Sequence, residues 1–243
     1  MTMDNTGYIA LSHQMALQRQ MDVIAHNIAN TSTTGYKANQ TLFEQFLMKA
    51  GPQRELSYVQ DFGVLINFRE GPIERTGNPL DIGLQGDGFL VAQTATGDLA
   101  YTRGGHLTIN AQGNLASAEG DAILDENRRP ILADPSLGPL IVNGDGSLTV
   151  GGRPPVRLAL VTFDNLQTLR RRGGGYFTTD SPEQVAPKAR TLQGMLERSN
   201  VEPVIELAAM IETSRAYQAS NKLIETEHEL QRKMAERLPQ LRG

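Results

Sequence analysis

Histidines, acidic turns and cysteines would carry any metal chemistry of this chain, and their spacing does not favour it. The run 143–146 (Asn-Gly-Asp-Gly) lacks the further acidic ligands of a calcium loop, so it is better explained as a turn. The chain has no Cys, which excludes disulfides, thiolate metal sites and cysteine nucleophiles. Four widely separated histidines form no zinc-helix motif: His13, His26, His106 and His228. We therefore predict no metal site and no cofactor.

Two other segments are candidates for binding phosphate or an acidic partner. The glycine-rich run 83–88 has the wrong spacing for a dinucleotide loop and is not followed by a helical pattern. The basic run Arg170-Arg171-Arg172 is better explained as a solvated loop, because the chain as a whole is acidic. With 23 basic and 27 acidic residues the formal net charge is −4, so nucleic acid is not expected as the main partner. We expect no small-molecule substrate either.

Catalytic residues are equally hard to find. The chain contains no Gly-x-Ser-x-Gly nucleophile elbow. Any two carboxylates could meet in the fold and act as acid and base, but most Asp and Glu lie on helical faces or in turns, where solubility explains them. We predict that the protein is not an enzyme and has no catalytic residue.

The elements that position these residues fall into three parts, within a length of 243 residues that suits one or two domains. Residues 5–30 and 200–238 contain almost no Gly and a single Pro, and both are predicted to be helical. Nearly all the other Gly and Pro lie between them. The first helix carries one apolar face at 4-3-4 spacing, formed by Leu17, Met21, Ile24 and Ile28.

The second helix is expected to run over 201–238, with Asn200 as its N-cap and Pro203 in the first turn. Its apolar side chains include Leu207 and Ile211, and three more recur every seventh residue: Met210, Tyr217 and Ile224. The partner heptad position is mostly polar, which lowers stability but can fix register and partner. A helix of this length favours assembly into a coiled coil or bundle; the alternative is a helix on the surface of its own domain.

The middle of the chain is predicted to be β. Short apolar runs at 89–92, 107–109, 140–142 and 156–163 are separated by turn residues, which favours an antiparallel sandwich or barrel. No helical stretch lies between them, so a βαβ fold is excluded. The predicted fold class is α+β: discontinuous terminal helices that pair as a coiled coil or bundle, and a central antiparallel β-rich domain. The expected parts are a helix over 1–35, an extended or irregular connector over 36–78, the β domain over 79–192 and a helix over 193–243.

The N-terminal residues do not form an ordinary targeting signal. Residues 1–30 have neither a basic n-region nor the apolar run of a Sec signal, so we expect no cleaved signal peptide. No stretch approaches the roughly 20 apolar residues of a membrane span, and we expect no membrane insertion.

Three segments of the chain carry a resemblance to one family. Residues 29–37 match the pattern Ala-Asn-x-x-Thr-Thr-Gly-Tyr/Phe-Lys through a signature loop that includes Asn30, Thr34, Gly35, Tyr36 and Lys37. The centre contributes Tyr101-Thr102-Arg103 and a core module of Gly77, Asn78, Pro79, Leu80, Asp81, Gly88 and Phe89. The closing signature lies at 193–201 and 210–217. In this order they resemble the axial rod and hook proteins of the bacterial flagellum.

Within this family, the opening residues 7–17 and the chain length are most like a proximal rod protein. The segment between Lys37 and Thr76 is short for a distal rod protein, which is the alternative together with other axial paralogues. A secreted β-domain binding module or hydrolase with helical ends is a more distant one.

The resemblance implies a structural subunit of the basal-body rod, part of a drive shaft that transmits torque across the periplasm. It implies paired terminal helices that build an inner tube, with the β domain outside. The partners would be further copies of the chain, the neighbouring proximal and distal rod proteins, and the flagellar type III export apparatus, which passes such chains unfolded and without a cleaved signal. We expect the helices to be marginal alone and to become ordered when their apolar residues are buried on assembly.

Overall fold

The computed structural model describes residues 4–49, 55–134, 136 and 138–237, and it divides the chain into two compact units. Counted over these residues, the helical unit comprises 4–29, 39–49, 55–66 and 202–237, and the β unit comprises 30–38 and most of 67–201. Three pieces of one unit therefore alternate with two of the other, and the chain passes between the units four times. The predicted α+β class, with terminal helices and a central antiparallel β region, is confirmed.

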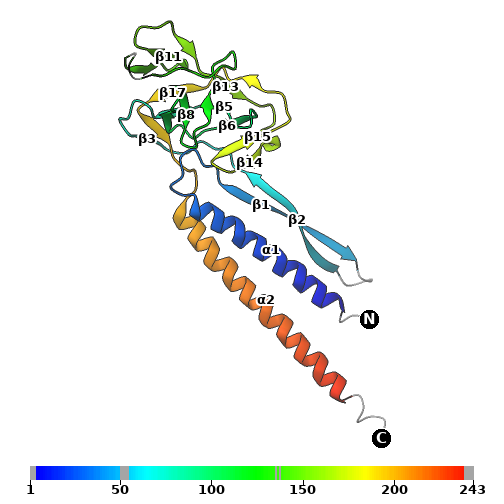
Figure 1. Cartoon of the computed structure of the whole chain (residues 1–243). Helices are drawn as coiled ribbons and strands as arrows, with labels where there is room; N and C mark the ends of the chain where they lie inside the picture. The colour runs from blue at the N-terminus through cyan, green and yellow to red at the C-terminus, as the bar shows by residue number, and fades with distance from the viewer. Residues whose placement is uncertain (1–3, 50–54, 135, 137, 238–243) are drawn as a thin grey trace. The chain divides into compact units, whose positions relative to one another are not determined.

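The helical unit contains two helices and a hairpin (Figure 1). Helix α1 spans Asp4–Ala29 and helix α2 spans Pro203–Arg237, and α1 packs against both α2 and the hairpin. Because α1 has two neighbours, its buried face is wider than one apolar stripe and includes Ala10, Ala16, Leu17, Val23 and Ile24. Neither helix is long and apolar enough, over its described residues, to cross a bilayer.

The hairpin lies within the expected connector at 36–78, and the sequence analysis did not identify it. Strands β1 (Asn39–Lys49) and β2 (Glu55–Ile66) pair antiparallel from Asn39 opposite Ile66 outward, with a register shift between Leu42 and Phe43. Adjacent apolar residues in β1 (42–43 and 46–48) break the alternation that identifies a strand from sequence. The shift is a β-bulge, which the period of two does not accommodate.

The β unit is built around one nine-stranded antiparallel sheet of order β14-β15-β6-β5-β9-β8-β7, with β13 beside β5 and β16 beside β13. The bounds of these strands are β5 Phe89–Gln93, β6 Leu99–Thr102, β7 Leu107–Ile109, β8 Leu115–Ser117, β9 Ala122–Ile123, β13 Leu160–Thr162, β14 Arg170–Arg172, β15 Tyr176–Thr178 and β16 Gln184–Val185. A 3-10 turn, η2 (Leu166–Thr168), precedes β14.

Smaller sheets complete this unit. A three-stranded sheet joins β10 (Leu140–Val142), β11 (Ser147–Val150) and β12 (Val156–Arg157). Two strand pairs bring distant segments together: β3 (Ile73–Arg75) pairs with β18 (Met195–Glu197), and β4 (Ile82–Gln85) pairs with β17 (Arg190–Gln193).

Two sequence-based expectations about the β region are wrong in detail. The single strand expected over 156–163 is two strands, because β12 pairs with β11 while β13 pairs with β5 in the larger sheet. The basic run at 170–172 is not a solvated loop but strand β14, at one edge of the nine-stranded sheet, with Arg171 half-buried. A hairpin partner, β15, turns this charged run into a strand.

The core of the β unit contains few but well-placed aromatic rings. Phe89 and Phe177 are almost fully buried, with ring centroids 5.8 Å apart in an edge-to-face arrangement. Phe68 lies 5.5 Å from Phe177, and Phe163 lies 6.1 Å from Phe89. Such pairs contribute about 0.5–1.5 kcal/mol each beyond the area that they bury.

We predict that Phe177→Ala destabilises the β unit by about 3–5 kcal/mol, because it leaves a cavity and removes two ring contacts. Leu132→Ala is the control, since Leu132 is exposed and its loss should change stability by less than about 0.5 kcal/mol. Urea unfolding followed by circular dichroism measures both. Equal effects of the two substitutions would contradict this description of the core.

Candidate functional site

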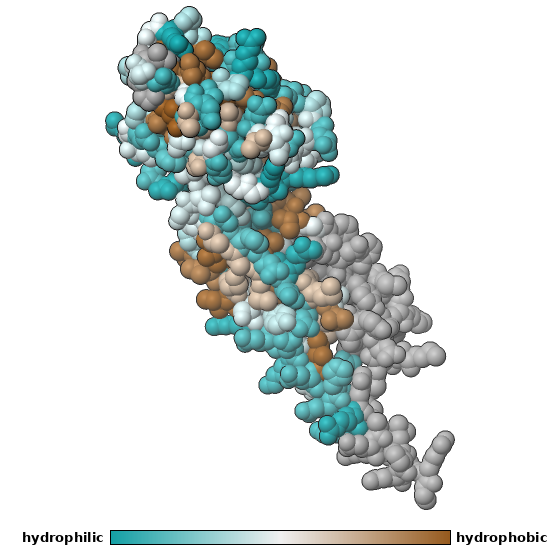
Figure 2. Space-filling model, in the orientation of Figure 1, coloured by the Kyte–Doolittle hydropathy of each residue, from teal (hydrophilic) through white to brown (hydrophobic). Residues whose placement is uncertain are grey.

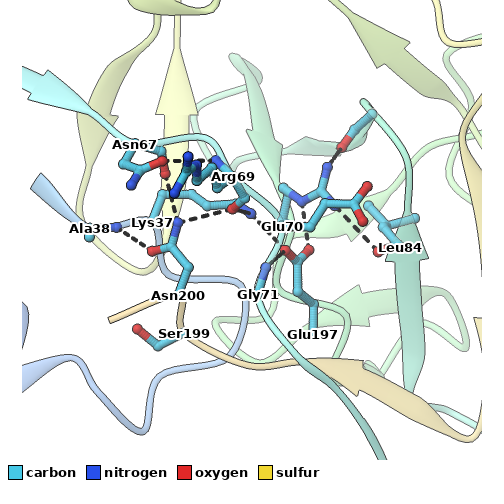
Figure 3. A network of polar contacts seen from close by, with 12 residues as sticks. Lys37, Ala38, Asn67, Arg69, Glu70, Gly71, Leu84, Glu197, Ser199 and Asn200 are labelled. Atoms are coloured by element: carbon cyan, nitrogen blue, oxygen red, sulfur yellow. Dashed lines mark hydrogen bonds and ion pairs between the residues drawn. The ribbon is translucent and has the colours of Figure 1, made fainter. Parts of the chain in front are cut away.

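Three buried charged side chains from distant segments meet in the β unit (Figure 3). The ammonium of Lys37 donates to Oε1 of Glu197 at 2.6 Å, and Nε of Arg103 donates to Oε2 of the same carboxylate at 2.6 Å. The Gly71 N–H also donates to Oε1, at 2.8 Å. The side chains of Lys37 and Glu197 are fully buried and that of Arg103 is 3% exposed. The Glu197 carboxylate therefore forms ion pairs with two cations and is shielded from water.

The remaining donors of the two cations bind backbone carbonyls. Lys37 donates a second bond to the Arg69 carbonyl at 2.7 Å. The Nη1 group of Arg103 donates to the carbonyls of Gly86 at 2.9 Å and Gly88 at 2.8 Å, and these residues connect β4 to β5. The cluster thus holds several chain segments as well as its own charges.

Burial makes this arrangement electrostatically demanding. It lowers the pKa of Lys37, the positive Arg103 lowers that pKa further, and the Glu197 carboxylate opposes both effects. Two buried cations share one buried anion, so removal of Glu197 would leave Arg103 without its ion-pair partner and Lys37 with only the weaker influence of the Glu70 carboxylate. Breaking a buried pair in this way typically costs about 3–5 kcal/mol.

Asn200 extends the network to the connections between the two units. Its Oδ1 accepts from the Ala38 N–H at 2.7 Å, and its Nδ2 donates to the carbonyls of Asn67 at 2.8 Å and Arg69 at 2.9 Å. Ala38 precedes the third piece of chain, Asn67 follows β2, and Asn200 lies just before α2. One side chain therefore joins three of the four connections. Below, Lys37, Arg103, Glu197 and Asn200 are called the connection cluster.

The expectation that Asn200 caps the second helix is wrong for this reason. Its side chain is fully used by the connections, and α2 begins at Pro203 instead. Proline suits the first helical position, where its missing N–H would have no partner anyway. The Glu206 N–H then donates to the Glu202 carbonyl at 3.1 Å.

The signature loop that the sequence singled out lies against this cluster. Gly35 has φ +67° and donates its N–H to the Glu197 carbonyl at 2.8 Å. A Cβ at this position would lie 2.4 Å from the Arg103 carbonyl carbon. Tyr36 is buried beneath the guanidinium of Arg171, which lies 4.3 Å from the ring centroid and also donates to the Lys37 carbonyl. Burial lowers the pKa of Arg171.

The first residues of this loop form a turn after α1. The Thr33 N–H donates to the Asn30 carbonyl at 3.2 Å, and the Thr33 hydroxyl donates to Oδ1 of Asn30 at 3.2 Å. Thr34 is half-buried beside them. Together these residues turn the chain from the helix toward Gly35.

Five residues of the core module, 77–81, form the turn between β3 and β4, and the other two, Gly88 and Phe89, lie at the start of β5. Asn78 accepts from the Leu80 N–H at 3.2 Å and donates to the carboxylate of Asp81 at 3.1 Å. Asp81 is buried and also lies 2.7 Å from Nδ1 of His106. The other members have structural positions: Gly77 with φ +75°, Pro79 accepting from Gln193, Leu80 packed on the core, Gly88 bound by Arg103, and Phe89 in the aromatic core.

The helix-packing candidates divide into two groups. Leu17 and Ile24 are buried within the chain, and five others are half-buried: Met21, Ile28, Met210, Tyr217 and Ile224. Gln14 donates to the Tyr217 hydroxyl at 3.0 Å and to Asn221 at 2.7 Å, so the seam between α1 and α2 is partly polar. Leu207 and Ile211, by contrast, are 52% and 55% exposed. A packing role for these two therefore stays a prediction about contact between subunits.

Asn27, which the sequence analysis did not identify, joins the three elements of the helical unit. It is almost fully buried, accepts from the Asn39 N–H at 2.8 Å, and donates to the Asn39 carbonyl and to Oε1 of Glu206, both at 2.9 Å. Burial raises the pKa of Glu206, although the bond from Asn27 opposes this shift.

The arrangement offers structural contacts rather than reaction chemistry. Among the described residues, no three His, Asp or Glu side chains gather as metal ligands. The buried acid and bases of the connection cluster bind one another and the backbone.

Comparison with known proteins identifies the family. Three family models match: one described as a flagella basal body rod protein (residues 8–37), one as a flagellar hook protein FlgE/F/G D1 domain (83–150) and one as a flagellar basal body rod FlgEFG protein C-terminal region (192–237). The flagellar basal-body rod protein FlgF of Caulobacter vibrioides is 39% identical over 97% of this chain and 98% of its own length. The chain belongs to the flagellar basal-body rod proteins.

Further relatives refine this assignment. FlgF of Mesorhizobium japonicum is 35% identical over 89% of the chain and 90% of its own length. FlgG of Buchnera aphidicola subsp. Schizaphis graminum is 28% identical over 91% of the chain and 95% of its own length. The rod protein is thus most like FlgF, as its sequence predicted, and it is a structural protein of the flagellar basal body in a family that is not one of enzymes.

Each of the three family matches contains part of the connection cluster of this rod protein. Lys37 ends the first matched region, Arg103 lies in the second, and Glu197 and Asn200 lie in the third. The sequence analysis quoted the motifs that contain them but assigned a specific role only to Asn200, as a helix N-cap.

We predict that Gly35→Ala destabilises the rod protein by about 2–5 kcal/mol, the sum of a left-handed backbone penalty and overpacking against Arg103. Gly77→Ala is a matched control, because Gly77 has a similar φ of +75° and nothing within 4 Å of its Cβ position. Only the backbone penalty of about 1–2 kcal/mol should remain there. Chemical unfolding of both variants tests this. If both lost the same stability, the close approach to Arg103 would not explain the glycine.

We also predict that Glu206→Gln stabilises the helical unit at neutral pH. The folded-state pKa of Glu206 is raised above its unfolded value, so the ionised form is penalised and the penalty disappears as pH falls through that pKa. A glutamine can still accept from Asn27. The melting midpoint of the helical circular-dichroism signal should rise at neutral pH and match the wild type in acid, while the exposed control Glu212→Gln changes little. A less stable variant at neutral pH would contradict this sign.

Proposed function

We propose that this chain is a subunit of the proximal part of the rod, that it assembles with copies of itself and with neighbouring proximal and distal rod proteins, and that it transmits torque across the periplasm. The higher identity to FlgF than to FlgG supports the proximal assignment. The observation that carries the assembly is the exposed face of α2.

Helix α2 has an apolar stripe on the side away from its buried residues. The half-buried and buried positions, such as Met210, Thr213 and Tyr217, follow one helical face. Elsewhere on the helix, exposed aliphatic side chains form two groups: Val204, Leu207 and Ile211 at 3-4 spacing, and Leu223 and Leu230 seven residues apart, which lie about a third of a turn round from Ile211. Figure 2 shows hydrophobic side chains gathered on the surface near the start of α2. We call these five residues the outer stripe.

The two last residues of the outer stripe, Leu223 and Leu230, line a shallow apolar groove on the C-terminal half of the helix. This groove is lined by Ala219, Lys222, Leu223, Thr226, Glu227 and Leu230. A helix with apolar residues on both faces is one that packs on two sides. The seam with α1 uses one side, which leaves the outer stripe for another subunit.

The energetic balance supports the same division of roles. The inner seam contains Gln14, Asn221 and Thr213, and polar seam positions fix register at the expense of stability. The outer stripe is aliphatic, and each Leu, Ile or Val buried there would contribute about 1.5–3 kcal/mol. Several such contacts together would favour the association of neighbouring subunits.

Transmission of torque would use the connections between the units. Any force passed along the chain from one unit to the other travels through the four connections, and Asn200 joins three of them. The connection cluster would keep these connections in register under force. Export as an unfolded chain by the flagellar type III apparatus is part of the proposal, and the absence of Cys suits passage through a narrow channel.

We predict that Ile211→Asp abolishes incorporation into the rod and swimming while the monomer stays folded. Ile211 is exposed in the chain, so the change in monomer stability should stay within about 0.5 kcal/mol. Circular dichroism of the monomer, composition of isolated basal bodies and swimming assays measure the three effects. Ile211→Val, which keeps an apolar side chain, is the control and should swim.

Ile24→Asp separates the two faces by its effect on the monomer. Ile24 is buried in the chain's own helical unit, so a charge there should unfold the helices of the monomer as well as prevent assembly. Normal rods and swimming with Ile211→Asp would refute the proposed role of the outer stripe.

A further inference from the structure

The order of the strands along the chain separates the β unit into an early and a late part. All the strands of the nine-stranded sheet lie between Phe89 and Val185. The connection cluster takes its only carboxylate from Glu197, which is 160 residues from Lys37 and 94 from Arg103. The sheet is therefore complete in sequence before the cluster has an anion.

The segment 190–201, here called the closing segment, also supplies backbone partners to much earlier residues. It contributes β17 to β4 and β18 to β3. The carbonyl of Gly194 accepts from the N–H groups of Thr76, at 2.8 Å, and Gly77, at 3.0 Å. The Glu197 carbonyl accepts from Gly35. Without the closing segment, the signature loop and β3–β4 lack their partners.

Charge makes the signature loop depend on this segment even more strongly. Burial of the Lys37 ammonium is costly without Glu197, because desolvation and the positive Arg103 both oppose its charge and the Glu70 carboxylate compensates less than Glu197 does. In the folded chain, both cations and the Gly71 N–H converge on the Glu197 carboxylate. The loop that follows α1 and the segment that precedes α2 must therefore become ordered together.

We propose that the connection cluster is a folding latch: the nine-stranded sheet forms first, and docking of the closing segment through Glu197 then orders the signature loop and the connections in a single late step. In a chain whose closing segment has not docked, the nine-stranded sheet would be formed but the connections to the helical unit would not be ordered. The latch goes beyond the proposed rod function and does not rest on it, since it is a property of the isolated monomer.

Pulse-labelling hydrogen exchange during refolding of the full chain tests the order directly. Amides of β5 and β6 should become protected in an early phase, and the amides of Gly35 and Gly71, which donate to Glu197, in a later one. Protection of both sets with one time constant would overturn the latch. Swimming and rod assembly are not part of this measurement, so its failure would leave the proposed function untouched.

Glu197→Gln tests the role of the charge in the native full-length chain. Exchange at Gly35 and Gly71 should accelerate at least about a hundredfold, the factor that follows from losing the counter-charge of a buried pair, while β5 and β6 change less than about threefold. Glu74→Gln is a matched control, because Glu74 also pairs with the closing segment, through Arg198, but its side chain is 54% exposed and such a surface ion pair contributes little. Its exchange pattern should match the wild type.

A second substitution distinguishes loss of the charge from simple damage. Adding Lys37→Met to Glu197→Gln removes one of the two uncompensated cations, and this should restore part of the protection at Gly71. Equal acceleration across the whole β unit, or no recovery in the double variant, would overturn the proposal. Loss of exchange protection in β5 and β6 of the Glu197→Gln variant would also overturn it, because the latch requires the sheet to form without the connection cluster.

Discussion

The buried carboxylate of Glu197 is the interaction on which the connections of this rod protein depend. Two cations and a backbone N–H converge on it, each within 2.8 Å. Ion pairs of this kind contribute little net stability compared with apolar packing, but they are costly to leave incomplete. In the folded chain, the buried ammonium of Lys37 finds its carboxylate partner in the segment around residue 197. A short signature loop after one helix is thereby placed against the segment that leads into the other.

This constraint explains why a rod protein needs so few large apolar residues. The aromatic core of the β unit is small, and the seam between α1 and α2 contains Gln14 and Asn221 rather than continuous leucine. Polar contacts fix where each segment goes, and the aliphatic residues of α2 lie largely on its exposed face. A subunit that buried its outer stripe internally would be more stable alone but would have less to gain from assembly.

Much of this architecture can be predicted from sequence, for physical reasons that also set the limit. The terminal helices follow from periodicity, and β5, β7 and β10 follow from apolar runs between turns. The hairpin β1–β2 is not predicted, because its apolar residues do not alternate and a bulge shifts its register. The connection cluster is not predicted either, because its members are far apart in sequence. In the sequence alone, its Lys, Arg and Glu cannot be distinguished from ordinary surface charges. Asn200 fits an N-cap locally, and only tertiary contacts show that its amide serves the connections instead.

The difference between Leu207 and Met210 illustrates what a helical pattern leaves open. Both fit an apolar pattern on α2, yet Met210 is half-buried within the chain, whereas the Leu207 side chain is exposed. Periodicity reports that a residue is apolar and on a given stripe, but it does not report whether the partner lies in the same chain. In a monomeric protein an apolar stripe with no partner would be a liability for aggregation. In a basal-body rod protein we propose that the same stripe is buried against a neighbouring subunit, and that the polar inner seam presents it in one register.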